Sequence, residues 1–295
     1  MMENLEKTLE KYYDKMGYAD NTRRSYTNCI NKFLDWCEDE SVTPMTATLD
    51  DMYTYISHIR KSGLSEHTVR ERIATAGHYF NAMGRKDNPV LFIRSGKPEK
   101  TIPKNLIDEE TMIDMYLSIQ PCTLRDRRNK VILGLMMFQG ITRQEAGLIE
   151  VEHVEFDKNR IYIPASAKIN ARYLPLKRLQ VDDLQDYVYR LRSQLLIESQ
   201  KVTERLFFSQ GIGHRVDNVL WLLAKELKLM YPQFKRFGQL RDSRIGIWLN
   251  VQKHDLREVQ YLSGMRYASS LLRHKRTDTD KLKRKLDLIH PMDRF

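Results

Sequence analysis

Apolar and polar residues follow a helical period through the first part of the chain. Segments 5–18, 22–40 and 64–85 place apolar or aromatic residues three or four positions apart, and segment 41–63 predicts a turn followed by a helix ending at Gly63. Asp20 or Asn21 is the expected N-cap of the second helix, and Ser65 that of the fourth. The expected core stripes of the second and fourth helices are Tyr26, Ile30, Phe33 and Trp36 or Cys37, and Val69, Ile73, Ala76 and Phe80.

The pattern is lost over residues 87–106, DNPVLFIRSGKPEKTIPKNL. This stretch combines prolines, one glycine and scattered charges without a period, which is typical of a linker. We therefore predict a helical domain over 1–86, a linker over 87–106 and a second domain over 107–295.

The second domain contains one region with the period of a β-strand. Apolar residues alternate at Ile161 and Ile163, a turn spans 166–171, and the chain returns through Tyr173, Leu174 and Leu176. The pattern elsewhere is helical: a buried helix over 130–138, a short helix from Thr142, and helices over 181–198, 217–230, 239–249 and 255–262. The expected fold class is mainly α with a small antiparallel β-sheet, in two domains.

The charge is distributed unevenly. The 295 residues carry a net charge of +10, yet residues 1–100 contain 15 basic and 15 acidic residues, so residues 101–295 carry the whole excess. The segment 241–295 alone has 13 basic and 7 acidic residues. Such asymmetry favours a polyanionic partner, chiefly nucleic acid, over an inert basic surface.

Other classes of protein are disfavoured by composition. No stretch approaches 18 uncharged apolar residues and the N-terminus is too acidic for a signal peptide, so we expect no membrane partner. Three cysteines without CxxC spacing indicate reduced thiols in the cytoplasm and no structural metal. None of the common metalloprotease, nucleotide-binding or serine-hydrolase motifs occurs.

Several weak signals become informative when they are taken in order. The buried helix ends in GITRQEAGL, the hairpin carries KINARYLPL, GQLRDSRIGIWL follows, and the last segment is LREVQYLSGMRYASSLLRHK. This succession resembles the tyrosine recombinase (phage integrase) family over nearly the whole chain, and it looks closest to integrases of Bacteroidetes mobile elements. The resemblance implies an N-terminal four-helix, SAM-like core-binding domain and a C-terminal catalytic-type domain that close around duplex DNA.

The resemblance also implies a chemistry that needs no metal or other cofactor. A tyrosine hydroxyl attacks a DNA phosphodiester and forms a 3′-phosphotyrosyl link. Two arginines and one or two histidines stabilise the charge on phosphorus, and a lysine from the hairpin protonates the leaving oxygen. This combines nucleophilic catalysis with electrostatic stabilisation of an anionic transition state.

Two of the family's basic positions are kept and the first arginine is displaced. Lys168 matches the hairpin lysine and Arg241 matches the second arginine. The first arginine is replaced by Thr142, and Arg143 lies one position later, which rotates the side chain by about 100° on a helix. Gly238 occupies a position that is often histidine.

The reactive groups of the last motif are missing. Met265 stands where the family has histidine or tryptophan, and His274 stands at the position of the nucleophilic tyrosine. Removing one charge-stabilising donor typically lowers a rate by about 10²–10³. We therefore expect a site-specific DNA-binding protein that acts in integration or recombination of a mobile element with an impaired catalytic centre.

The sequence leaves two alternatives open. The chain could be an active recombinase that uses His274, Tyr267 or a tyrosine supplied by a partner chain. It could also be a structural or regulatory DNA-binding protein unrelated to recombination.

The expected partner is double-stranded DNA in the cytoplasm, at the nucleoid. In the C-terminal domain, Lys168 and Arg241 are the expected DNA contacts. The C-terminal stripe Leu282, Leu286 and Ile289 is a candidate for self-association, or for assembly with a competent recombinase. The basic residues expected to face DNA in the first domain are Arg23, Arg24, Arg70 and Arg72.

Overall fold

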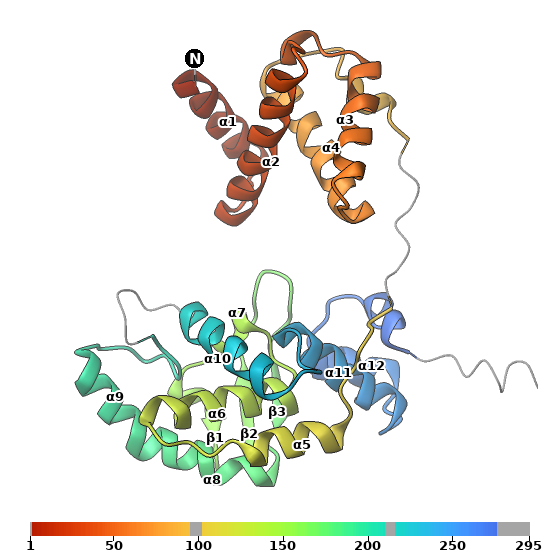
Figure 1. Cartoon of the computed structure of the whole chain (residues 1–295). Coiled ribbons are helices and arrows are strands. Elements are labelled where there is room, and N and C mark those ends of the chain that lie inside the picture. The colour runs from red at the N-terminus through yellow and green to blue at the C-terminus, as the bar shows by residue number, and fades with distance from the viewer. Residues whose placement is uncertain (1, 95–101, 210–215, 276–295) are drawn as a thin grey trace, which may run out of the picture. The chain divides into compact units, whose positions relative to one another are not determined.

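The computed structural model describes residues 2–94, 102–209 and 216–275 (Figure 1). The chain divides into two compact units, residues 1–100 and 101–295, each with its own hydrophobic core. Within the described ranges no helix is long and apolar enough to cross a membrane. The candidate self-association stripe at 282–289 lies outside the described residues.

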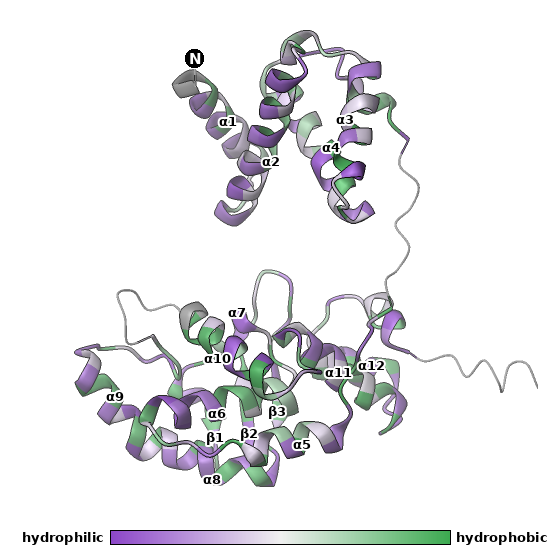
Figure 2. Ribbon diagram, in the orientation of Figure 1, coloured by the Kyte–Doolittle hydropathy of each residue, from purple (hydrophilic) through white to green (hydrophobic). Residues whose placement is uncertain are grey.

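The N-terminal unit is built from four α-helices: α1 (Met2–Met16), α2 (Asp20–Asp39), α3 (Leu49–Lys61) and α4 (Glu66–Ala82). The short 3-10 turns η1 (Pro44–Thr46) and η2 (Pro89–Phe92) complete it. The expected stripes are buried in the core, with Tyr26 half-buried at its edge. Hydrophilic positions dominate the visible faces of α1 and α2 in Figure 2.

Side-chain caps mark the starts of α3 and α4 in this unit. Ser65 caps α4 by accepting a hydrogen bond from the Thr68 amide, as predicted. The prediction for α2 was wrong: the helix begins at Asp20, and its N-cap is Ala19, whose side chain has no hydrogen-bond acceptor. The acidic Asp20 lies instead in the first helical turn, where a negative charge interacts favourably with the helix dipole.

The apolar helix α6 (Leu124–Phe138) and a three-stranded antiparallel sheet supply much of the core of the C-terminal unit. The strands β1 (Val154–Glu155), β2 (Arg160–Ile163) and β3 (Arg172–Pro175) pair in the order β1-β2-β3, with Ile161 opposite Leu174. The predicted hairpin is thus confirmed. Helices α5 (Glu109–Ser118), α8 (Arg178–Asp186), the π turn η4 (Tyr187–Leu191) and α9 (Arg192–Ser199) pack around this core.

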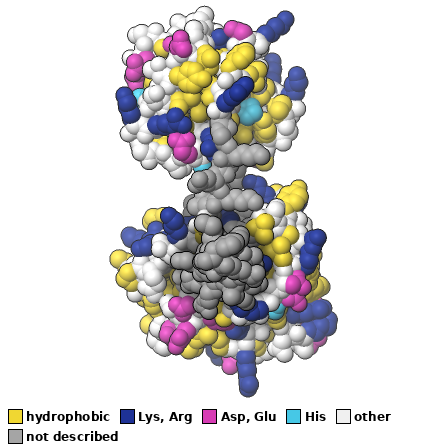
Figure 3. All heavy atoms as spheres, turned by 90° about the vertical axis from the view of Figure 1, so that its right-hand side faces the viewer, with side chains coloured by type: hydrophobic (Ala, Val, Ile, Leu, Met, Phe, Trp, Pro, Cys, Tyr) yellow, Lys and Arg dark blue, Asp and Glu magenta, His cyan; other side chains and the backbone are white. Residues whose placement is uncertain are grey.

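The remaining elements carry the residues of the expected site. They are α7 (Arg143–Ala146), η3 (Val151–His153), α10 (Asp217–Met230), α11 (Phe237–Asn250), α12 (Leu256–Ser263), η5 (Ala268–Ser270) and η6 (Leu272–His274). Figure 1 shows α7, α10 and the turn between β2 and β3 on the same side of the unit, with α8 on the other. Basic side chains are scattered over the face of this unit drawn in Figure 3.

Candidate nucleic-acid interface

Thr142, at the position of the expected first arginine, acts as a helix cap. Its hydroxyl accepts a hydrogen bond from the Glu145 amide at 3.2 Å, and the Glu145 carboxylate accepts one from the Thr142 amide at 2.8 Å. This reciprocal capping box satisfies two amides that the start of α7 would otherwise leave unpaired. Arg143 is the next residue, and it is exposed.

Glu145 is the centre of a buried charge network. Its side chain is fully buried and forms an ion pair with the fully buried Arg172, at 2.5 Å. Arg241 approaches the other carboxylate oxygen at 3.7 Å. Because a buried charge is stable only when it is paired and hydrogen-bonded, these three residues depend on one another.

Arg172 is a central residue that the sequence interpretation missed. Besides the ion pair, its Nε donates to the Leu262 carbonyl at 2.8 Å, which ties β3 to α12. A signal for it was present, since Leu174 and Leu176 alternate toward the core and Arg172 continues that alternation on the same face. An arginine at an inward position of a strand predicts a buried acidic partner.

Arg241 is held rigidly from both sides. Its Nη1 donates to the Gly140 carbonyl at 2.5 Å and its Nη2 donates to the Ser263 carbonyl at 2.6 Å. Burial lowers the pKa of Arg241 to about 10, although Glu145 opposes the shift. The guanidinium therefore stays charged at neutral pH in a fixed orientation, which suits the recognition of an anion.

The hairpin turn is anchored to the segment that follows α12. The Asn170 amide donates to the Gly264 carbonyl at 2.8 Å, and Ile169 forms an antiparallel bridge with Met265. Gly264 has a φ of +68°, and a Cβ there would lie 2.6 Å from Arg172 Nη1. Lys168 is exposed and directly precedes Ile169, so this pairing with Met265 anchors the hairpin turn next to Lys168.

His274 lies inside the protein, in η6. Its side chain is buried, its Nε2 accepts a hydrogen bond from Arg273 Nε at 3.1 Å, and Asp242 Oδ1 is 3.8 Å from the same nitrogen. Burial lowers the pKa of His274 to about 4, with Asp242 opposing the shift. Tyr267, by contrast, lies at the start of η5 and is 71% exposed.

A cavity of about 330 Å³ brings together Thr142, Arg143, Gly238 and Arg241. Five of its lining residues are Lys or Arg, and none of the described residues that line it is Asp or Glu. A Cβ at Gly238 would lie 2.8 Å from Arg236 Nη1, so glycine makes room for that guanidinium. The basic members that the sequence interpretation missed are Lys228, Lys235 and Arg236.

The four arginines expected to face DNA in the N-terminal unit have different environments. Arg23 is half-buried, forms ion pairs with Asp14 at 2.6 Å and Glu10 at 3.4 Å, and donates to the Tyr18 carbonyl, so it ties α2 to α1. Arg24 is exposed, whereas Arg70 and Arg72 are half-buried on α4.

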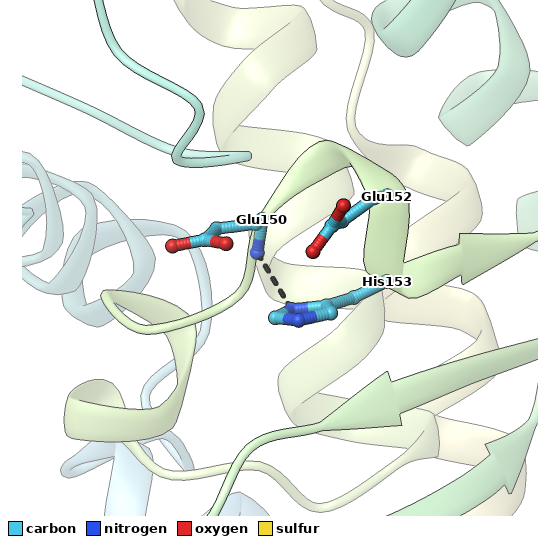
Figure 4. Close-up of side chains that lie close together, drawn as sticks. All are labelled: Glu150, Glu152 and His153. Atoms are coloured by element: carbon cyan, nitrogen blue, oxygen red, sulfur yellow. Dashed lines mark hydrogen bonds between the residues drawn. The ribbon is translucent and has the colours of Figure 1, made fainter.

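One group of side chains has the composition of a metal site. Glu150, Glu152 and His153 lie close together around η3 (Figure 4). Two of them already have other partners: His153 Nδ1 accepts a hydrogen bond from the Glu150 amide at 2.9 Å, and the Glu150 carboxylate pairs with Arg205 at 3.0 Å. We interpret this group as a cap of η3.

Comparisons with known proteins agree with this architecture. Residues 7–86 match the family model "Phage integrase, N-terminal SAM-like domain". Tyrosine recombinase XerC of Pelotomaculum thermopropionicum is 26% identical, with 92% of this chain and 93% of that protein covered. The sequence is therefore similar to tyrosine recombinases over nearly its whole length. The resemblance seen in the sequence motifs is thereby confirmed.

Solved structures of a site-specific recombinase and of a transposon integrase share the fold over almost the whole chain. XerH recombinase bound to a palindromic difH substrate superposes with a TM-score of 0.71 at 16% identity, covering 97% of this chain and 84% of that one. The Tn1549 transposon integrase in complex with a circular intermediate DNA gives a TM-score of 0.68 at 13% identity, covering 97% and 99%. The expected fold class, mainly α with a small antiparallel sheet, is confirmed for this chain.

Proposed function

We propose that this tyrosine recombinase binds duplex DNA at a specific site and acts in the recombination of a mobile element without cutting the strand itself. The basic cavity beside α7, α10 and α11 carries the proposal. It presents Arg143, Lys228 and Arg236 around the buried Arg241, which is the arrangement that an anionic phosphodiester requires.

The same surroundings argue against strand cleavage by this chain. The family's nucleophile position is His274, which is buried and neutral at pH 7 because its pKa is about 4. Thr142 and Met265 replace two groups that stabilise charge in the family, and neither side chain is ionic. Each lost donor lowers a rate by about 10²–10³, although such losses are not additive.

The relatives support the proposed biological role. XerH was solved on a palindromic difH substrate, and the Tn1549 transposon integrase was solved with a circular intermediate DNA. By analogy with them, this chain would occupy a recombination site together with a competent recombinase that supplies the nucleophile. Lys168 and Arg241 are the proposed phosphate contacts from the hairpin and α11.

The proposal is tested by the salt dependence of DNA binding. Affinity for a fluorescently labelled duplex is measured by anisotropy over a range of salt concentrations, for the native protein and for Arg143→Gln and Arg236→Gln. Each phosphate contact contributes roughly 0.9 to the slope of log K against log salt. We expect each substitution to reduce the slope by about 1.

Arg190→Gln is the matched control for these variants. Arg190 is also an exposed arginine, but it lies in η4 and pairs with Asp186. Its replacement should leave the slope unchanged. Absence of duplex binding, or an equal effect of all three substitutions, would show that the cavity does not hold the DNA backbone.

A further inference from the structure

We infer that Trp221 is a stacking platform for an unpaired nucleobase next to the phosphate held in the basic cavity, an inference that rests on the proposed function. The chain has three tryptophans. Trp36 and Trp248 are 3% and 7% exposed, whereas Trp221 is 65% exposed. An indole so exposed is unusual, because tryptophan is highly buried on average.

The position of Trp221 on α10 links it to the basic cavity. Trp221 lines the cavity, and so do Ala224 and Lys228, which follow it at helical spacings of three and seven residues. These three positions therefore share one face of α10. Leu222 is also exposed, but neither it nor the exposed Leu229 lines the cavity. Phe237 also lines the cavity but is buried, so Trp221 is the exposed aromatic side chain of this cationic site.

The charge of the residues that line the cavity determines which kind of partner can bind beside Trp221. Arg143, Lys228, Lys235, Arg236 and Arg241 line the same cavity, and Arg143 and Lys228 have no carboxylate partner in the described part of the chain. A partner must therefore be anionic and must also offer a flat apolar face. A nucleotide combines both features, since its phosphate binds basic side chains and its base stacks on an aromatic ring.

The geometry further restricts the kind of nucleic acid. Both faces of a base inside an intact duplex are covered by its neighbours, so an indole can stack only on a base that has left the helix. Extruding a base costs less where the strand is already interrupted or unpaired. We therefore expect this site to prefer DNA with a single-stranded gap over intact duplex, which makes Trp221 a determinant of DNA structure rather than of base sequence.

The inference is tested with two labelled DNA probes of the same sequence, an intact duplex and a duplex with a short single-stranded gap. The native protein should bind the gapped probe more tightly. Stacking of one base is worth about 1–3 kcal/mol, so Trp221→Ala should weaken binding to the gapped probe by roughly 5- to 150-fold. Binding to the intact duplex should weaken by a clearly smaller factor, because stacking contributes only where a base is unpaired.

Two further variants separate stacking from a general loss of structure. Trp221→Phe keeps an aromatic ring and should retain part of the preference, whereas Leu229→Ala, on the same helix but 80% exposed and outside the cavity, should retain all of it. In the native protein, gapped DNA should also quench the tryptophan emission, and this quenching should disappear in Trp221→Phe.

The outcomes distinguish this inference from the proposed function. Equal binding of both probes by the native protein, or an equal loss in Trp221→Ala for both, would overturn the stacking role while leaving duplex binding in place. Failure of both probes to bind would overturn the proposed function itself. Quenching of Trp221 by polyglutamate without binding of either DNA would instead indicate an acidic protein partner.

Discussion

Replacing Arg172 by Met should destabilise the C-terminal unit strongly. The substitution keeps an apolar stem of similar length but removes the guanidinium that pairs with Glu145, and both side chains are fully buried. Removing one partner of a buried ion pair costs about 3–5 kcal/mol, because the other charge is left uncompensated. Arg241, 3.7 Å from Glu145, partly compensates that charge, so we expect a loss near 3 kcal/mol.

Urea unfolding followed by tryptophan fluorescence measures this loss. In a Trp36→Phe background the remaining tryptophans, Trp221 and Trp248, both report on the C-terminal unit. With a slope of about 2 kcal/mol per molar urea, the midpoint of unfolding should fall by roughly 1.5 M.

A double-mutant cycle shows whether the ion pair is the cause. Glu145→Gln removes the charge but keeps an oxygen that can accept the hydrogen bond from the Thr142 amide. The double variant Glu145→Gln with Arg172→Met should lose roughly 1–3 kcal/mol less in free energy of unfolding than the two single losses added together. A loss below about 1 kcal/mol for Arg172→Met, or strictly additive effects, would refute the role assigned to the buried network.

Two further predictions concern His274 and Gly264. The pKa of His274 is about 4 in the folded chain, against 6.5 for the ordinary side chain. As the pH drops, the unfolded state therefore takes up a proton on this histidine before the folded state does. The free energy of unfolding should fall between about pH 6.5 and about pH 4, by at most roughly 3 kcal/mol. Urea unfolding of His274→Gln at several pH values should show a smaller decline over that window, and an unchanged decline would contradict the assignment. Gly264→Ala should lower stability by more than the roughly 1–2 kcal/mol that a positive φ costs any side chain, because the new Cβ also meets Arg172 and Ile169. Its control is Gly63→Ala, which has φ +72° and open space around the new Cβ, and equal losses in the two variants would exclude the steric contribution.

The amphipathic helices and the hairpin could be predicted because their patterns are local. Val69, Ile73 and Phe80 repeat at the helical period and are buried in α4, and Ile161 and Ile163 alternate and are buried in β2. The start of α2 could not be placed, because Asp20 is a good residue both for an N-cap and for the first turn.

The candidate site was predicted only in part. Arg143 and Arg241, named from motif spacing, line the basic cavity, whereas Lys168 does not. Lys228, Arg236 and Trp221, which also line it, come from positions in α10 and before α11 that no local pattern joins. Their convergence depends on how these helices pack, which is tertiary information. Arg172 was accessible in principle from the alternation in β3.

Covalent capture on a nicked suicide substrate tests the central claim most directly. On such DNA the short fragment beyond the cut diffuses away, so any cleaving recombinase remains attached to the cut end and shifts on a denaturing gel. For the native chain, in which we propose that His274 occupies the nucleophile position, we expect binding to the substrate without a covalent adduct. The variant carrying Thr142→Arg, Met265→His and His274→Tyr is the positive control and should form an adduct. A side-chain oxygen of the native chain joined to a cut DNA end would contradict the account.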